Sequence, residues 1–240
     1  MLLPKPQKFS ARLSAIEKIS SKVYLERFEL IEPKEITFFA GQTIMLFVAP
    51  GINRSMSIAS VPDEKNSLTL IHDISPNGPY SKWALAARVG DAMQFMGPLG
   101  IFVLDKESPR NKVFVATGSG IAPFYSMISD ALSHCTLRPE PCTLSLYWGL
   151  RREEDMFWRV EFEDLEKQFS NFKFTLTLSQ PTESWQGKKG HVEDHVFADI
   201  QNLSGSDFYL CGSKMMTDEM RSKLKVANVP AAQVKFEMFY

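Results

Sequence analysis

Two glycine-containing turns have the residue types of phosphate-binding sites. In "VFVATGSGIAPF" (113–124), an apolar run ends in a turn containing Gly118 and Gly120, and Pro123 stands near the start of a predicted helix. Glycines let backbone amides approach a ligand, and the amino end of a helix favours a phosphate. The third glycine of the dinucleotide-binding fingerprint is missing, so an ordinary strand-to-helix turn is the alternative.

The second turn is "NGPYSKWALAAR" (77–88), where Gly78 and Pro79 precede Ser81 at the opening of a predicted helix. This arrangement also suits a phosphate, because the first amides of a helix have no partner within it. The alternative is a simple helix cap in which Ser81 satisfies one of these amides.

Three further segments carry polar groups in strand-like surroundings. In "NRSMSIASVP" (53–62), polar and apolar residues alternate, which predicts either a half-buried strand or one whose Arg54, Ser55 and Ser57 contact a ligand. The segments "YLCGSKMM" (209–216) and "KFEMFY" (235–240) are predicted strands that end at the ligand-binding edge of a parallel sheet. A cysteine such as Cys211 is equally compatible with a small core residue.

The elements that position these residues differ between the two halves of the chain. The first half contains short strand-like runs separated by Gly, Pro, Asn and Asp, at 11–19, 23–30, 43–50, 54–60, 67–74 and 92–100, with one helix near 79–89. This spacing predicts an antiparallel barrel or sandwich.

The second half alternates between strands and helices. Strands are predicted at 112–118, 142–149, 172–179, 207–212 and 233–239, and helices at 122–135, 157–169, 194–200 and 213–226. Such alternation predicts a parallel sheet with helices on both faces. The charged segment "DKESPRNK" (105–112) is the predicted seam, which gives domains of residues 1–107 and 108–240.

Composition narrows the functional class. The 240 residues are 44% hydrophobic and 23% charged with a net charge of −1, which indicates a globular protein without a nucleic-acid surface. The sequence predicts no membrane span and no secretory signal. Three cysteines, Cys135, Cys142 and Cys211, are too few for an iron–sulfur cluster and fit a cytoplasmic location. We expect no metal at "HVEDH" (191–195), which is not a zinc-protease motif.

Seven motifs occur in a fixed order along the chain. They are "RSMS" (54–57), "GPYS" (78–81), "GPLG" (97–100), "TGSGIAPF" (117–124), "LYWGLRREEDMFW" (146–158), "LCGSKMM" (210–216) and "FEMFY" (236–240). Together they resemble the ferredoxin–NADP reductase superfamily of flavoprotein reductases, from about Ala11 to Tyr240. The resemblance implies a Greek-key antiparallel β-barrel that binds flavin, followed by a Rossmann-like α/β domain that binds NAD(P)H, without an iron–sulfur domain.

The resemblance also assigns flavin-binding residues. It implies that Arg54 pairs with the flavin phosphates, that Ser55 and Met56 lie along the flavin, and that Ser57 places its hydroxyl near N5. Met56 stands where the family usually has an aromatic residue. The helix start that holds the phosphate corresponds to Gly78, Pro79, Tyr80 and Ser81. Phe239 would shield the flavin, and Tyr240 would stack on an adenine, which favours FAD over FMN.

The nicotinamide half is assigned in the same way. The turn under the NAD(P)H pyrophosphate and nicotinamide corresponds to Thr117, Gly118, Gly120 and Pro123. Cys211 and Gly212 match the Cys-Gly pair beside the nicotinamide, and Glu237 matches a carboxylate near the reaction centre. The expected catalytic residues are therefore Ser57, Cys211 and Glu237.

The choice between NADH and NADPH stays open at this stage. NADPH-using relatives commonly read the 2′-phosphate with a Ser-Arg pair, but here Ser179 is followed by Gln180. Arg151 and Lys188 still occupy positions where such relatives place cations. The missing arginine favours NADH, since each charge-assisted hydrogen bond contributes about 1.5–3 kcal/mol.

The expected function is transfer of hydride from NAD(P)H to FAD and then of electrons to a ferredoxin, a flavodoxin, an oxygenase component or a small molecule. One alternative is a reductase subunit of a multicomponent oxygenase or dehydrogenase complex. Another is a non-catalytic nucleotide-binding scaffold or sensor.

Overall fold

The computed structural model describes residues 2–133 and 142–239 and, for Phe239, the backbone. Cys135 and Tyr240, both singled out above, therefore lie outside the described residues. Backbone contacts divide the chain into two compact units. The first unit is Met1–Leu104 with Ala122–Asp130, and the second is Asp105–Ile121 with Ala131–Tyr240. The domain boundary at 107/108 stays a prediction.

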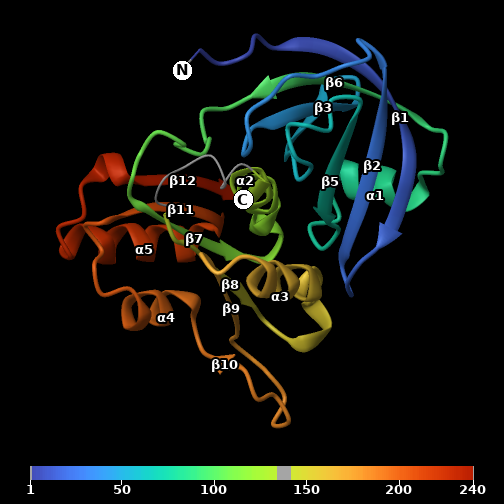
Figure 1. Ribbon diagram of the computed structural model, residues 1–240. Helices are drawn as coiled ribbons and strands as arrows, with labels where there is room; N and C mark the ends of the chain where they lie inside the picture. Colours follow the sequence, from blue (N-terminus) through green and yellow to red (C-terminus); the bar gives the residue numbers. More distant parts are fainter. Residues whose placement is uncertain (1, 134–141, 240) are drawn as a thin grey trace. The chain divides into compact units, whose positions relative to one another are not determined.

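The first unit contains a six-stranded antiparallel half-barrel with the strand order β4-β3-β6-β1-β2-β5 (Figure 1). Its strands are β1 (Gln7–Lys18), β2 (Val23–Glu32), β3 (Thr43–Ala49), β4 (Ile52–Ser57), β5 (Ser67–Asp73) and β6 (Ala92–Leu99). One helix, α1 (Pro79–Ala86), lies between β5 and β6 in the chain. The predicted antiparallel class is confirmed, and each predicted strand overlaps an observed one.

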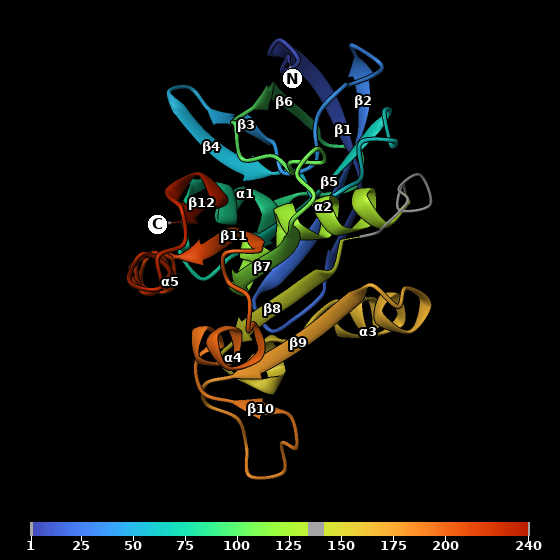
Figure 2. The ribbon, with the colours of Figure 1, turned by 60° about the vertical axis from the view of Figure 1, so that its left-hand side comes forward.

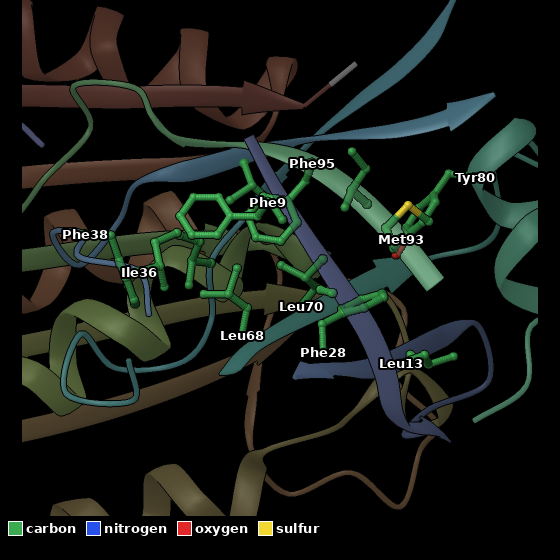
Figure 3. Close-up of a cluster of buried hydrophobic side chains, with 14 residues drawn as sticks. Phe9, Leu13, Phe28, Ile36, Phe38, Leu68, Leu70, Tyr80, Met93 and Phe95 are labelled. Carbon is green, nitrogen blue, oxygen red and sulfur yellow. The ribbon is translucent and has the colours of Figure 1, made fainter. Parts of the chain in front are cut away.

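Inward-facing side chains of the half-barrel form one hydrophobic core, shown in Figure 3. Phe9 of β1 stacks on Phe95 of β6 with ring centroids 4.9 Å apart. Tyr80 of α1 belongs to the same cluster, and its neighbour Trp83 stacks against both Tyr80 and Phe28. The helix is thus packed onto the core of the barrel through its aromatic residues.

The second unit is built on a six-stranded parallel sheet with the order β10-β9-β8-β7-β11-β12. Its strands are β7 (Asn111–Thr117), β8 (Leu144–Leu150), β9 (Phe172–Leu178), β10 (Lys188–Lys189), β11 (Ser206–Ser213) and β12 (Val234–Phe239). The helices are α3 (Arg159–Gln168), α4 (Val192–Asp199) and α5 (Lys214–Val226), and α2 (Ala122–Ser133) is shared between the units. The predicted α/β class is confirmed.

Helices cover both faces of the parallel sheet. On one face, α4 and α5 bury their apolar residues against Tyr147 and the other residues of a second core cluster. On the opposite face, Phe162 of α3 packs edge-on to Trp148 and contacts Phe174 of β9. Figure 2 shows α4 and α3 beside β8 and β9. Because both faces are covered, strands such as β8 are apolar along nearly their whole length.

The two-residue strand β10 was not predicted, and α4 begins at Val192, before the predicted 194. Near these elements, His195 of the "HVEDH" segment donates through Nε2 to the carbonyl oxygen of Lys189, at 3.0 Å. In the described part of the chain, every helix is too short or too polar to cross a membrane.

Candidate functional site

The first candidate region lies in the first unit, where β4, β5 and the start of α1 meet. We call it the α1 corner, and it consists of Arg54, His72, Gly78, Tyr80 and Ser81. The Arg54 guanidinium lies 3.5 Å from the position that a Cβ on Gly78 would occupy. Gly78 is the N-cap of α1 and Pro79 follows it, so no side chain at the cap position competes for the free amides of the first turn. The predicted residues Arg54 and 78–81 are therefore brought together at the amino end of α1, where free amides favour an anion.

His72 is a member of this corner that the sequence did not indicate. Its Nε2 is hydrogen-bonded to Oγ of Ser81, 2.9 Å away. Burial lowers the pKa of His72 from 6.5 to about 4; Asp73 opposes this shift and Arg54 adds to it. The imidazole is consequently neutral at pH 7, and its hydrogen bond fixes the Ser81 side chain in the first turn of α1.

A buried carboxyl group of β2 holds the same helix on the barrel. The Tyr80 hydroxyl donates a hydrogen bond to Oε2 of Glu26, a fully buried residue of β2. Burial raises the pKa of Glu26 to about 7, although the hydrogen bond from Tyr80 acts in the opposite direction. The Tyr80 ring also meets the edge of His72, with ring centroids 4.7 Å apart. Glu26 and His72 together hold the first turn of α1 on the barrel.

Ser57 ends β4 next to this corner in sequence. The residue is 4% exposed, and its Oγ has no hydrogen-bond partner among the described residues. A buried hydroxyl left in this state costs about 1–3 kcal/mol, which makes the Ser57 hydroxyl a candidate ligand contact. Met56 packs against the barrel core, while Ser55 is exposed. The donor set therefore fits the phosphate and ring of a flavin.

The second candidate region lies in the second unit, at the carboxyl ends of β7 and β11. Thr117 Oγ1 accepts a hydrogen bond from the backbone N–H of Ser213, at 2.8 Å. Gly212 has φ +141°, and a Cβ there would lie 2.3 Å from Thr117 Oγ1. A Cβ on Gly120 would lie 2.4 Å from the carbonyl oxygen of Cys211. Only glycine fits at these two positions, and the two chain segments leave bare backbone at the sheet edge where α/β proteins bind ligands.

Cys211 and Glu237 are neighbours across β11 and β12. Cys211 is fully buried, and burial raises the pKa of its thiol well above the ordinary value, with a further contribution from the charge of Glu237. The thiol is therefore protonated at neutral pH and lacks the character of a nucleophile. Its full burial agrees with the alternative of a small core residue.

The residues predicted to contact the adenosine end of NAD(P)H are separated into two groups. Ser179 and Gln180 follow β9, and their backbone amides donate to the carbonyls of Leu150, the last residue of β8, and Arg151, which follows it. Lys188 instead faces Asp199 of α4, with Nζ 2.7 Å from Oδ2. Phe239 ends β12 in register with Ser213, and Pro123 is the second residue of α2.

Comparisons with known proteins agree with this two-part arrangement. Residues 10–104 match the family described as "Oxidoreductase FAD-binding domain" and residues 114–222 match "Oxidoreductase NAD-binding domain". The chain is 31% identical over 241 residues to ferredoxin–NADP reductase B of Sorangium cellulosum, covering 96% of this chain and 97% of the relative. It is 27% identical to the anthranilate 1,2-dioxygenase electron transfer component of Acinetobacter baylyi, covering 86% of this chain but 59% of that protein.

Among solved structures, the Amycolatopsis cytochrome P450 reductase GcoB superposes with a TM-score of 0.89 at 24% identity, covering 99% of this chain and 71% of that one. That likeness concerns the fold, whereas the nearly full-length sequence match concerns the family. The chain therefore belongs to the ferredoxin–NADP reductase family of FAD-dependent NAD(P)H oxidoreductases.

Proposed function

We propose that the α1 corner and Ser57 hold FAD, that the Thr117–Gly120 turn and Gly212 hold the dinucleotide, and that electrons then pass to a separate acceptor. The observation that carries this proposal is the buried Ser57 hydroxyl, which finds no partner among the described residues. When bound, the flavin supplies the hydride-accepting atom and the capacity to release electrons one at a time.

The roles of the protein side chains follow from their surroundings. Arg54 and the first amides of α1 neutralise phosphate charge, and the neutral His72 keeps the Ser81 hydroxyl oriented. Ser57 donates its hydroxyl proton as a hydrogen bond to the flavin ring. Glu237 positions the nicotinamide, while the buried Cys211 acts through the packing of its strand, and its protonated thiol leaves no thiolate that could attack the ring.

Ser57→Ala is expected to lower the rate of flavin reduction by NADH or NADPH about 10- to 100-fold, since losing a hydrogen bond of about 1.5–3 kcal/mol slows a step tenfold for every loss of about 1.36 kcal/mol. Flavin should stay bound, because its phosphate contacts lie at the α1 corner. Stopped-flow absorbance measures the reduction rate, and the flavin content is read from the spectrum. Ser55→Ala, an exposed change on the same strand, is the control. A Ser57→Ala rate equal to that of the control would remove the proposed role.

The acceptor is proposed to be a ferredoxin, a flavodoxin or an oxygenase component. In the described residues the free cysteines are Cys142 and Cys211, too few to hold an iron–sulfur cluster within this part of the chain. The likeness to a dioxygenase electron transfer component favours, as a second candidate, a subunit that reduces an oxygenase partner. Assays with ferricyanide and with a purified ferredoxin separate the candidates. A ferredoxin reductase should reduce both acceptors, whereas a subunit that reduces an oxygenase partner should reduce ferricyanide but not ferredoxin.

The cytoplasmic location is likewise a proposal. It is supported by the odd number of cysteines in the sequence. Fractionation of the source cells with detection of the chain by antibody tests it, and recovery in the membrane or secreted fraction would contradict it.

A further inference from the structure

A carboxylate stands at the sheet edge where the adenosine end of the dinucleotide is proposed to bind. Glu153 follows β8, and its Oε1 accepts two hydrogen bonds from Thr182: one from the backbone N–H at 2.9 Å and one from the hydroxyl at 2.6 Å. Thr182 belongs to the loop that follows β9. Glu153 therefore ties together the two loops that carry Arg151 and Ser179.

The loops are held in contact along their length. Ser179 N–H donates to the carbonyl of Leu150 at 3.0 Å, and Gln180 N–H donates to the carbonyl of Arg151 at 2.8 Å. By the resemblance to the reductase superfamily, position 180, the second residue after β9, is where NADPH-using members carry an arginine. The Glu153 carboxylate is thus fixed beside the backbone that would surround the 2′ position of the adenosine ribose.

Glu153 is ionised at neutral pH. The hydrogen bond from the Thr182 side chain lowers its pKa below the ordinary value, and Lys189 contributes in the same direction. Since Thr182 binds Oε1, the second oxygen can accept a hydrogen bond from a ribose hydroxyl. An acidic side chain that accepts from the ribose 2′-hydroxyl is the usual way in which α/β folds recognise NAD rather than NADP.

Two of the nearby cations are already paired with carboxylates. Lys188 Nζ lies 2.7 Å from Asp199, and Arg152 lies 3.7 Å from Glu154. Asp199 is also bound by the Tyr147 hydroxyl, so it is fixed beside Lys188. Arg151 has no carboxylate partner among the described residues. A 2′-phosphate, with a charge of about −1.5 to −2, would meet the fixed Glu153 carboxylate, whose charge offsets that of the nearby cations Arg151 and Lys189.

We propose that Glu153 is the residue that makes this enzyme select NADH over NADPH, by accepting a hydrogen bond from the ribose and by repelling a 2′-phosphate. This inference rests on the proposed dinucleotide site at the ends of β7, β8, β9 and β11. Asp199 supports the selection by engaging Lys188, which would otherwise be available to a phosphate.

The test is calorimetric binding of 5′-ADP and 2′,5′-ADP to the FAD-loaded protein, which does not depend on turnover. Wild type is expected to bind 5′-ADP at least tenfold more tightly than 2′,5′-ADP. Glu153→Gln is expected to strengthen 2′,5′-ADP binding about tenfold, since the amide oxygen still accepts from Thr182. Asp199→Asn is expected to strengthen it severalfold by releasing Lys188. Glu161→Gln, which neutralises an exposed carboxylate of α3 outside the two loops, is the control and should match wild type.

The outcomes separate the two proposals. Equal affinities of Glu153→Gln and Glu161→Gln for 2′,5′-ADP, or tighter binding of 2′,5′-ADP than of 5′-ADP by wild type, would overturn the role of Glu153 alone. Failure of wild type to bind either nucleotide, together with no reduction of the flavin by NADH or NADPH, would overturn the proposed dinucleotide site itself. A Glu153-dependent preference for 5′-ADP supports both.

Discussion

Replacing Lys112 by methionine is expected to lower the free energy of unfolding by about 3 kcal/mol, toward the low end of what is lost when a buried ion pair is broken. Lys112 of β7 is 2% exposed, and its ammonium donates to Asp207 Oδ2 at 2.7 Å and to the carbonyl of Ser108 at 3.0 Å. Methionine fills a similar volume but removes the buried cation that pairs with the Asp207 carboxylate. Arg110, 2.6 Å from Asp207 Oδ1, remains and limits the loss.

Chemical denaturation followed by tryptophan fluorescence measures this effect. Arg110→Met is the matched control, because its side chain is 39% exposed and pairs with the same carboxylate; we expect a loss below about 1 kcal/mol. The double change Lys112→Met with Asp207→Asn should recover much of the loss, since it removes the uncompensated charge. A single-variant loss no larger than that of Arg110→Met would contradict this account.

The parts of the fold that are visible in the sequence are those governed by local periodicity. The strands 43–49 and 144–150 were predicted at nearly their observed bounds because apolar runs and turn residues delimit them. Strand β10 could not be found in this way. It is two residues long, and its two lysines take part in the sheet only through register with Thr177 and Leu178 of β9.

The site shows the same division between local and long-range determinants. Arg54 and the residues 78–81 lie in short motifs, which the resemblance identifies directly. The partner that anchors Tyr80 is Glu26, 54 positions away, in a strand where a charged residue looks like a surface residue. One signal was available: Glu26 lies two residues before Phe28, so both side chains point to the face of the strand that packs on the core. His72 had no comparable signal, because its role depends on contact with Ser81.

Glu26 and His72 should make the free energy of unfolding depend on pH in opposite directions. Substituting one residue at a time should reveal the contribution of the other. The pKa of Glu26 is about 7 in the folded protein and 4.5 ordinarily, so folding favours its neutral form. Its contribution is fully present below pH 4.5 and is lost as the pH rises through 7, by about 3 kcal/mol. The pKa of His72 is about 4 against 6.5, so its contribution is present above pH 6.5 and is lost as the pH falls through 4.

The two windows overlap between pH 4.5 and 6.5, where the slopes oppose each other in wild type. Glu26→Gln keeps an acceptor for Tyr80 and removes the ionisation, so its stability should rise with pH across the His72 window. His72→Gln keeps a partner for Ser81, so its stability should fall as the pH rises across the Glu26 window. Denaturation midpoints of flavin-free protein over this pH range measure both slopes, with Glu29→Gln, an exposed change on β2, as control.

The sign of the slope of stability against pH distinguishes a lost ionisation from a lost contact. A substitution that only removes a packing contact would lower the free energy of unfolding equally at every pH. If Glu26→Gln and Glu29→Gln had parallel pH profiles, Glu26 would not carry the proton assigned to it. The consequence for the site is direct: near neutral pH, the helix start that receives the flavin phosphates is held by a carboxyl group close to its own pKa. Flavin affinity should therefore weaken as the pH rises above 7 in wild type but not in Glu26→Gln, measured by fluorescence titration with FAD.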